Sequence, residues 1–311
     1  MSTRLFGPRC GGFATARHAM MAVCIGAAIV SQVDSVSAQS GTPQLPPVVL
    51  QPPMNTATKP WTGKRLPDGQ PDLGAGVWDI PLGGTGRLDN PWNASCFDSP
   101  TCFPYKNPRP SRVVYPADGR VPYQPWALAR QMKQEVDYLN PTAEEHIDPQ
   151  ARCLPSSVPR LNYYIAEYKI LQIPDYVVFV WDSYHAYRVI PLNGGPRLAS
   201  NVKTWMGDAR GRWDGNTLIV ETTNINGKMR LNSRGDFYSD QAHLMERFVF
   251  TDADNMVYEV TITDPTVYTR PWTMRVLHKR LPKTGADAEF WEEACVEGND
   301  VRPGGIDSRI K

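Results

Sequence analysis

The sequence predicts a mainly β fold, an antiparallel barrel or sandwich in which a lipocalin-like barrel is favoured. From about residue 163 onward, short stretches of β-branched and aromatic residues alternate with tight turns. The long helical crossovers that a parallel sheet needs do not separate these stretches. We therefore expect about six to eight antiparallel strands in roughly 115 residues.

Turn residues separate the expected strands. Asp214-Gly215-Asn216 leads into one strand of a hairpin, and Asp252-Ala253-Asp254-Asn255 joins the two strands of another. The expected strands are Lys169–Ile173, Tyr176–Trp181, Tyr184–Leu192, Thr217–Thr223, His243–Thr251, Met256–Thr263 and Trp272–Leu281.

Residues 61–311 are expected to form a single β-rich domain with a loop-rich N-terminal part, residues 61–160. The chain has 29 Pro and 24 Gly, and many of them fall in this part, which favours loops over regular structure. Its best helix candidate is Pro125–Leu139, which has helical periodicity and ends before Asn140-Pro141. A second short turn is expected at Ala143–His146.

Residues 1–38 have the pattern of a secretory signal peptide, with early arginines, the apolar run Ala19–Ser31 and a small-residue cleavage site near Ala38. A membrane anchor is the alternative, but a spanning helix needs about 20 apolar residues. Lipidation at Cys24 is disfavoured by the unbroken apolar run around it. Residues 39–60 are a Pro-rich linker or extended arm. We expect a periplasmic or secreted protein with no integral membrane span after cleavage.

Four cysteines follow the expected cleavage site, and an even number suits disulfides in an oxidising compartment. Of the three possible pairings, Cys96–Cys102 and Cys153–Cys295 are favoured. The first closes a short loop of turn-forming residues, and the second ties the C-terminal segment to the body. A four-cysteine zinc site would need paired CxxC spacings, which the sequence lacks.

Charge and motifs exclude several function classes. The 33 basic and 32 acidic residues give a net charge of +1, so a nucleic-acid partner is not expected. The chain has no GxSxG elbow, Walker loop, GxGxxG, HExxH or CxxCH motif. We therefore expect no cofactor and no metal, and a small-molecule ligand as the partner.

Six motifs together resemble a large group of exported proteins of soil and aquatic bacteria, most of them uncharacterised. The resemblance covers most of the chain after the leader and implies export, but no activity. This chain departs from the group at Asn193-Gly194-Gly195-Pro196-Arg197, where the group often has DGRPH. The motifs are PDLxxGVW (71–78), RCLPxxVPR (152–160), HxYRxIPL (185–192), GDxRGRWxGxTLxVETTN (207–224), ERF (246–248) and DPTxYTRPWT (264–273).

His185 and Tyr187 are candidate catalytic residues. Alternation along the expected strand Tyr184–Leu192 places them on one face, and inside a barrel they would form an acid/base pair. The alternative is a solvent-exposed sheet face on which hydrogen bonds satisfy both side chains.

Glu246 is the candidate carboxylate, because alternation places it among the apolar residues of its strand. A buried carboxylate must be paired or shift its pKa, so it is either a general base or half of a buried ion pair. His243 and Glu246 are three residues apart, a spacing that places two metal ligands on one face of a helix. On a strand the same spacing points the two side chains to opposite faces, which disfavours a metal site. The possible arginine partners are Arg188, Arg212, Arg247, Arg270 and Arg275.

Other polar and aromatic residues of the strand region are candidates for ligand binding. Aromatic rings there would either stack on a ligand or simply pack the core. The candidate ligand-binding residues are Arg188, Trp205, Glu221, His243, Arg247 and Trp272.

Three functions fit these observations. The first is an exported barrel that binds a small apolar or aromatic molecule in its cavity. The second is a cofactor-free lyase, isomerase or hydrolase that uses His185, Tyr187 and a carboxylate, and it requires these side chains to converge. The third is a surface interaction protein, which an exposed apolar patch outside the barrel mouth would indicate.

Overall fold

The fold is that of a computed structural model. Every described residue belongs to one compact unit, Leu45–Lys311. The expected signal peptide, residues 39–47 of the linker and the Cys96–Cys102 pair lie outside the described residues. The structure describes residues 48–74, 76–81, 84, 86–89, 109–139, 141–164, 166–282 and 290–295.

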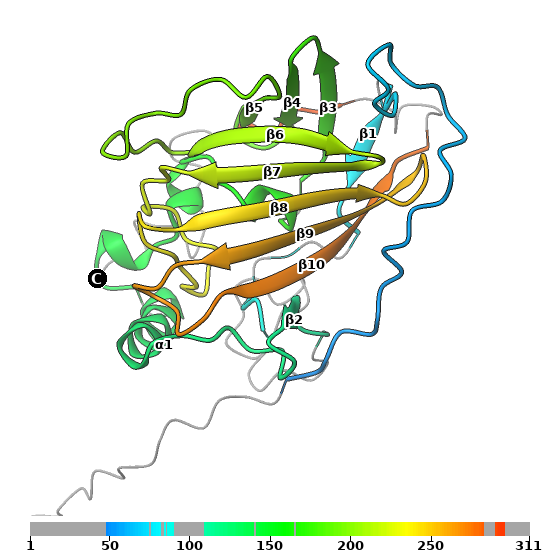
Figure 1. Cartoon of the computed structure of the whole chain (residues 1–311). Helices are drawn as coiled ribbons and strands as arrows, with labels where there is room; N and C mark the ends of the chain where they lie inside the picture. The colour runs from blue at the N-terminus through cyan, green and yellow to red at the C-terminus, as the bar shows by residue number, and fades with distance from the viewer. Residues whose placement is uncertain are drawn as a thin grey trace, which may run out of the picture. The chain divides into compact units, whose positions relative to one another are not determined.

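Within the described residues, ten antiparallel strands form one nearly closed, barrel-shaped sheet (Figure 1). The strand order is β5-β4-β3-β1-β10-β9-β8-β7-β6, and β2 pairs with β10 beside this path. The strands are β1 (Val77–Asp79), β2 (Val113–Tyr115), β3 (Tyr168–Ile173), β4 (Tyr176–Trp181), β5 (Tyr187–Pro191), β6 (Asp208–Asp214), β7 (Thr217–Thr223), β8 (His243–Phe250), β9 (Asn255–Thr263) and β10 (Trp272–Arg280).

The mainly β barrel confirms the predicted fold class. The helix α1 has the predicted bounds, Pro125–Leu139, and begins with a proline whose missing N–H is not needed there. A 3₁₀ helix, Glu144–His146, occupies the expected short turn. Two short strands that the sequence did not predict, β1 and β2, lie in the loop-rich part before the helix. Both strands have three residues, too few for a periodic pattern to reveal them.

The predicted strand Tyr184–Leu192 is too long at its start. Ser183 to Ala186 form a turn instead, in which the Ala186 N–H donates to the Ser183 carbonyl at 3.1 Å. Tyr184 and His185 have φ of 57° and 54°, the left-handed backbone of a tight hairpin turn. β5 therefore begins at Tyr187.

Large side chains fill the interior of the barrel. Trp78, Trp181 and Trp272 are 0–2 % exposed, and Phe179 and Phe248 from opposite walls lie 4.9 Å apart between ring centroids. Buried positions alternate with more exposed ones along β4 and β10. Large aromatic side chains thus fill the core that the described strands enclose.

Side chains close the gap between β5 and β6, the two ends of the strand order. A Cβ on Gly211 of β6 would lie 2.7 Å from Ile190 Cγ2 and 2.9 Å from Leu192 Cδ2. Glycine is therefore needed there so that the β5 side chains can lie against the β6 backbone.

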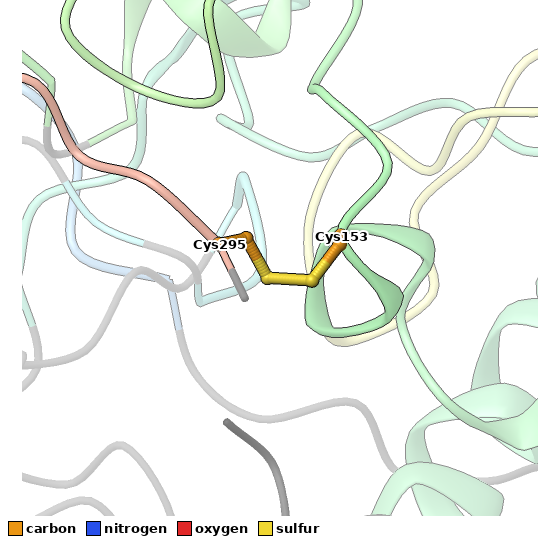
Figure 2. The surroundings of a disulfide bond; sticks show 2 residues. All are labelled: Cys153 and Cys295. Carbon is orange, nitrogen blue, oxygen red and sulfur yellow. A yellow bond between two sulfur atoms is a disulfide. The ribbon is translucent and has the colours of Figure 1, made fainter. Parts of the chain in front are cut away.

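A C-terminal strap, which we define as residues 290–295, crosses the turn between β4 and β5. Glu293 exchanges backbone hydrogen bonds with Asp182 (2.8 Å) and Tyr184 (2.9 Å). The strap ends at Cys295, whose disulfide to Cys153 confirms the predicted pairing (Figure 2). The segment that contains Cys153 and the C-terminal segment are thus joined across 142 residues of chain.

Residues 48–60 have no regular structure and run along the outside of the barrel (Figure 1). The Val49 carbonyl accepts from Ser111 N at 2.7 Å, and Lys59 N donates to the Thr251 carbonyl at 3.0 Å. This part of the expected linker is thus an arm bound to the domain. Among the described helices, none combines the length and the apolar character that crossing a membrane would demand.

Candidate functional site

Glu246 of β8 lies inside the barrel and is fully buried, as its strand pattern predicted. Its carboxylate accepts two hydrogen bonds from the Arg188 guanidinium, at 3.0 and 2.5 Å. The hydroxyls of Tyr258 (2.9 Å) and Thr222 (3.1 Å) donate to it as well. Both oxygens of this buried ion pair are thus occupied, while Arg188 Nε is buried without a hydrogen-bond partner among the described residues.

His278 of β10 belongs to the same buried region. Its Nε2 lies 2.9 Å from the Asn162 carbonyl, and its Nδ1 lies 2.5 Å from the Tyr168 hydroxyl. Because a carbonyl only accepts, Nε2 carries the proton and Nδ1 accepts from the tyrosine. Burial lowers the pKa of His278 to about 3, so the ring is neutral.

His185 and Tyr187 lie outside the barrel. Tyr187 is 64 % exposed, because its strand turns Arg188 and Ile190 inward instead. His185 sits in the turn before β5, with its Nδ1 2.6 Å from Glu292 of the strap. The structure therefore does not bring this pair together with Glu246.

Glu221 and His243 do come together, on the outer face of β7 and β8. Glu221 Oε1 lies 2.7 Å from His243 Nε2, and Arg197 pairs with the other oxygen. The hydrogen bond from His243, together with Arg197, lowers the pKa of Glu221. Arg247 lies on the same outer face, opposite Ile219 and Glu259. This is an open surface rather than a cavity.

The two candidate tryptophans lie apart from this surface and from each other. Trp205 is half-buried in the loop before β6, where its indole N–H donates to the Pro155 carbonyl at 2.9 Å. Trp272 is fully buried at the start of β10, with its ring edge against Tyr268 at 5.5 Å. The nine residues predicted for catalysis or ligand binding thus occupy the core, the outer face and the loops, without a shared cavity.

A cavity of about 240 Å³ lies instead beside the barrel, between the loop that follows β2, the start of α1 and the segment that enters β10. Its walls combine apolar side chains with charged ones. Pro116, Val121, Pro122, Tyr123 and Leu128 supply apolar surface, while Arg87, Arg120, Arg270, Asp89 and Asp118 supply charge. The volume lies below the roughly 300–1,000 Å³ of drug-sized ligand pockets, so the space is that of a smaller molecule.

Local hydrogen bonds hold the cavity walls in place. The Gln124 N–H donates to the Val267 carbonyl, and the Thr269 N–H donates to the Pro122 carbonyl, both at 2.8 Å. The loop after β2 is therefore fixed along the segment that leads into β10. Its tip is a turn in which the Asp118 carboxylate accepts from Arg120 N at 3.0 Å.

Tyr123 joins the cavity to a buried carboxylate behind it. Its hydroxyl donates to Asp236 Oδ1 at 2.8 Å, while Leu88 N (2.9 Å) and Asn232 Nδ2 (2.5 Å) donate to Asp236 Oδ2. Burial raises the pKa of Tyr123 and of Asp236, and Arg87 only partly offsets this for the carboxyl. The ring of Tyr123 is thus held rigidly against Phe237 and Tyr268.

Arg87 is a fixed cation at the cavity. Its Nε lies 3.0 Å from Asp89, and its Nη1 lies 3.0 Å from Gln131 and 3.2 Å from Glu135. Burial alone would lower the pKa of Arg87, but the surrounding carboxylates outweigh burial and raise it. Arg270 is exposed at the rim. Of the three arginines that line the cavity, Arg87 is thus held by its own partners and Arg270 is the exposed one, and a guanidinium such as that of Arg270 suits an anionic group.

Across the described part of the chain, no three His, Cys, Asp or Glu side chains gather as metal ligands. The sequence did not indicate this site, because Arg87, Tyr123, Asp236 and Arg270 come from four distant loops with no shared periodicity.

No protein family model, curated protein or solved structure matches the chain.

Proposed function

We propose that this protein is exported and binds a small, largely apolar or aromatic molecule that carries an acidic group, in the cavity beside the barrel. The cavity carries the proposal, because Tyr123 and other apolar side chains line it together with the exposed Arg270. Guanidinium groups bind carboxylates strongly, and aromatic rings favour flat apolar ligands. The disulfide supports export, because such bonds persist in oxidising compartments.

Binding is proposed rather than catalysis. A catalytic trio of His185, Tyr187 and Glu246 would have to face one substrate, but the first two lie outside the barrel and the third is buried with both oxygens bonded. Because large side chains fill the core, we propose the cavity beside the barrel, rather than the barrel interior, as the binding site.

The test is a titration of the purified protein with benzoate, and with benzyl alcohol as its uncharged equivalent, followed by amide chemical shifts in NMR. We expect saturable benzoate shifts around Tyr123, and much weaker shifts with the alcohol. Arg270→Gln should weaken benzoate binding at least about tenfold, the value of a charge-assisted hydrogen bond. The matched control is Arg212→Gln, an exposed arginine of β6 outside the cavity, which should bind as the parent does.

Equal binding of benzoate and benzyl alcohol, or equal affinities of the two arginine variants, would contradict the acidic-ligand proposal. Shifts confined to interior residues such as Phe179 and Val220 would return the site to the barrel.

A further inference from the structure

Two of the charged side chains that line the cavity beside the barrel are exposed, and they have opposite signs. Asp118 belongs to the loop after β2, and Arg270 belongs to the segment that enters β10. Neither forms an ion pair with any of the described residues. Arg87 and Asp89, by contrast, are buried and pair with each other at 3.0 Å, and Arg120 has an interaction of its own within the chain. The cavity therefore offers a ligand one accessible carboxylate and one accessible guanidinium.

The backbone that carries Asp118 is held in a tight turn. Gly119 N donates to the Pro116 carbonyl at 3.0 Å, and Ser111 Oγ donates to the Gly119 carbonyl at 2.7 Å. The Asp118 carboxylate accepts from Arg120 N at 3.0 Å through Oδ1. Its Oδ2 has no hydrogen-bond partner in the described part of the chain. One oxygen of Asp118 thus fixes the turn, and the other is left to meet a ligand.

The backbone that carries Arg270 is held as well. The residue before it, Thr269, donates to the Pro122 carbonyl through both its N–H (2.8 Å) and its hydroxyl (3.1 Å). The residue after it is Pro271, whose ring fixes its own φ. Pro122 belongs to the same loop as Asp118, so the two segments that carry the exposed charges are bonded to each other.

The size of the cavity keeps a bound ligand within range of both charges. A compact space of 240 Å³ is about 8 Å across, while exposed charges interact over about 10 Å at 0.1 M salt. A carboxylate bound at Arg270 would therefore also be repelled by Asp118. An ammonium group on the same ligand would offset this repulsion and pair with Asp118. The two exposed charges thus suit a ligand that carries both signs better than a simple anion.

We propose that the cavity binds a small aromatic zwitterion with one ring, one amino group and one acidic group, and that Asp118 selects the amino group. This inference rests on the proposed function and narrows its class of ligand. The volume agrees with one ring and a short polar arm, because an apolar cavity of about 150 Å³ takes up benzene. Tyr123, whose ring is fixed against Phe237 and Tyr268, supplies aromatic surface for the ligand ring.

The test is an NMR titration of the purified protein with two pairs of ligands, in which one member of each pair lacks the amino group. Phenylalanine is compared with hydrocinnamate, and para-(aminomethyl)benzoate with para-toluate. The amino group is thus placed beside the acid in the first pair and across the ring from it in the second. We expect at least one zwitterion to bind about fivefold more tightly than its matched acid, with amide shifts around Tyr123.

Variants then assign the amino group to Asp118. Asp118→Asn keeps the oxygen that accepts from Arg120 N, so the turn is retained. It should weaken the zwitterion about threefold or more and leave the matched acid bound at least as tightly as before, a difference that a purely structural role would not produce. Arg270→Gln should weaken both ligands. The matched control is Asp214→Asn, at an exposed carboxylate of β6 outside the cavity, which should bind both as the parent does.

The titration separates failure of this inference from failure of the proposed function. If neither acid and neither zwitterion binds, the proposed function falls and this inference falls with it. If the acids bind at the cavity and neither amino group improves the affinity, the inference is overturned while the site for an acidic ligand stands. Equal weakening of acid and zwitterion by Asp118→Asn would also overturn the role of Asp118. Thermal melts of each variant confirm that it is folded.

Discussion

Arg188 of β5 and Glu246 of β8 form a bidentate ion pair across the interior of the barrel, with N–O distances of 3.0 and 2.5 Å and exposures of 2 % and 0 %. The residues lie 58 positions apart in the sequence. Because Thr222 and Tyr258 bond the same carboxylate, four strands (β5, β7, β8 and β9) meet at this one group.

The first prediction concerns the loss of one partner of this pair. Glu246→Leu leaves an unpaired buried guanidinium, so we expect a loss of about 3–5 kcal/mol of unfolding free energy in urea denaturation. The double variant Arg188→Met with Glu246→Leu removes both charges and should be more stable than the single variant. A single variant that loses less than about 1 kcal/mol would show that water reaches the pair.

The strand pattern placed Glu246 in the core and offered Arg188 among five possible partners, but it did not single out the partner. Alternation is a local signal that shows which way a side chain points. Which two strands face each other across a barrel depends on closure of the whole sheet, and no local pattern encodes that. The helix Pro125–Leu139 was predictable to its ends, because a proline begins it and Asn140-Pro141 follows it.

The turn before β5 shows a second limit of prediction from the sequence. Tyr184 and His185 adopt left-handed backbone without the glycine or asparagine that usually signals it. Alternation therefore continued through the turn and placed His185 in a strand. The bonds that hold this turn come from the strap, more than 100 residues later. The cavity was missed for a similar reason, since its walls are loops brought together only by the fold.

The second prediction concerns closure of the barrel at Gly211. Gly211→Ala places a methyl group within 3 Å of Ile190 and Leu192, and their strand cannot retreat without opening the barrel. We expect a loss of about 1–3 kcal/mol in urea denaturation. Gly215→Ala is the comparison without crowding, because its Cβ would meet nothing within 4 Å. Any stability that it loses comes from backbone strain at its φ of +58°. Restoration of stability by Ile190→Val in the Gly211→Ala background would identify crowding as the cause.

The third prediction is a pH dependence caused by His278. Its folded pKa of about 3 lies below the ordinary value of 6.5, so the unfolded chain binds the proton more readily. The stability that the neutral His278 ring contributes to the fold is complete above pH 6.5 and is lost as the pH falls toward 3. We expect the unfolding free energy of the parent to decline there more steeply than that of His278→Gln, by up to 1.36 kcal/mol per pH unit. Equal slopes would mean that the ring is protonated in the fold.

The fourth prediction has the opposite sign and concerns Asp182. Burial, together with the nearby carboxylates of Glu293 and Glu167, raises its pKa to about 6. The folded protein therefore binds this proton more readily than the unfolded chain, and stability is lost as the pH rises through about 4 to 6. Asp182→Asn should melt at a higher temperature than the parent at pH 7.5 and at the same temperature near pH 4. A variant that is less stable at both pH values would show that the charged carboxylate is needed.

The fifth prediction concerns the disulfide that anchors the strap. Cys153–Cys295 closes a span of 142 residues, and chain entropy alone assigns such a bond about 5 kcal/mol, of which 2–5 is usually measured. Cys153→Ser with Cys295→Ser should lose that much stability in urea. It should also speed chymotrypsin cleavage after Trp291, which is already 67 % exposed, because the strap then depends on its hydrogen bonds to Asp182, Ser183 and Tyr184.

The same double variant separates the two expected disulfides. Reductant should lower the unfolding free energy of the parent toward that of the double variant, because it opens Cys153–Cys295. Any further loss when the double variant itself is reduced reports on Cys96 and Cys102, the remaining pair of the sequence after the expected leader. The reductant must be shown to free the thiols of Cys153 and Cys295. If the unfolding free energy of the parent then stays the same, strap packing rather than the covalent bond holds the C-terminal segment in place.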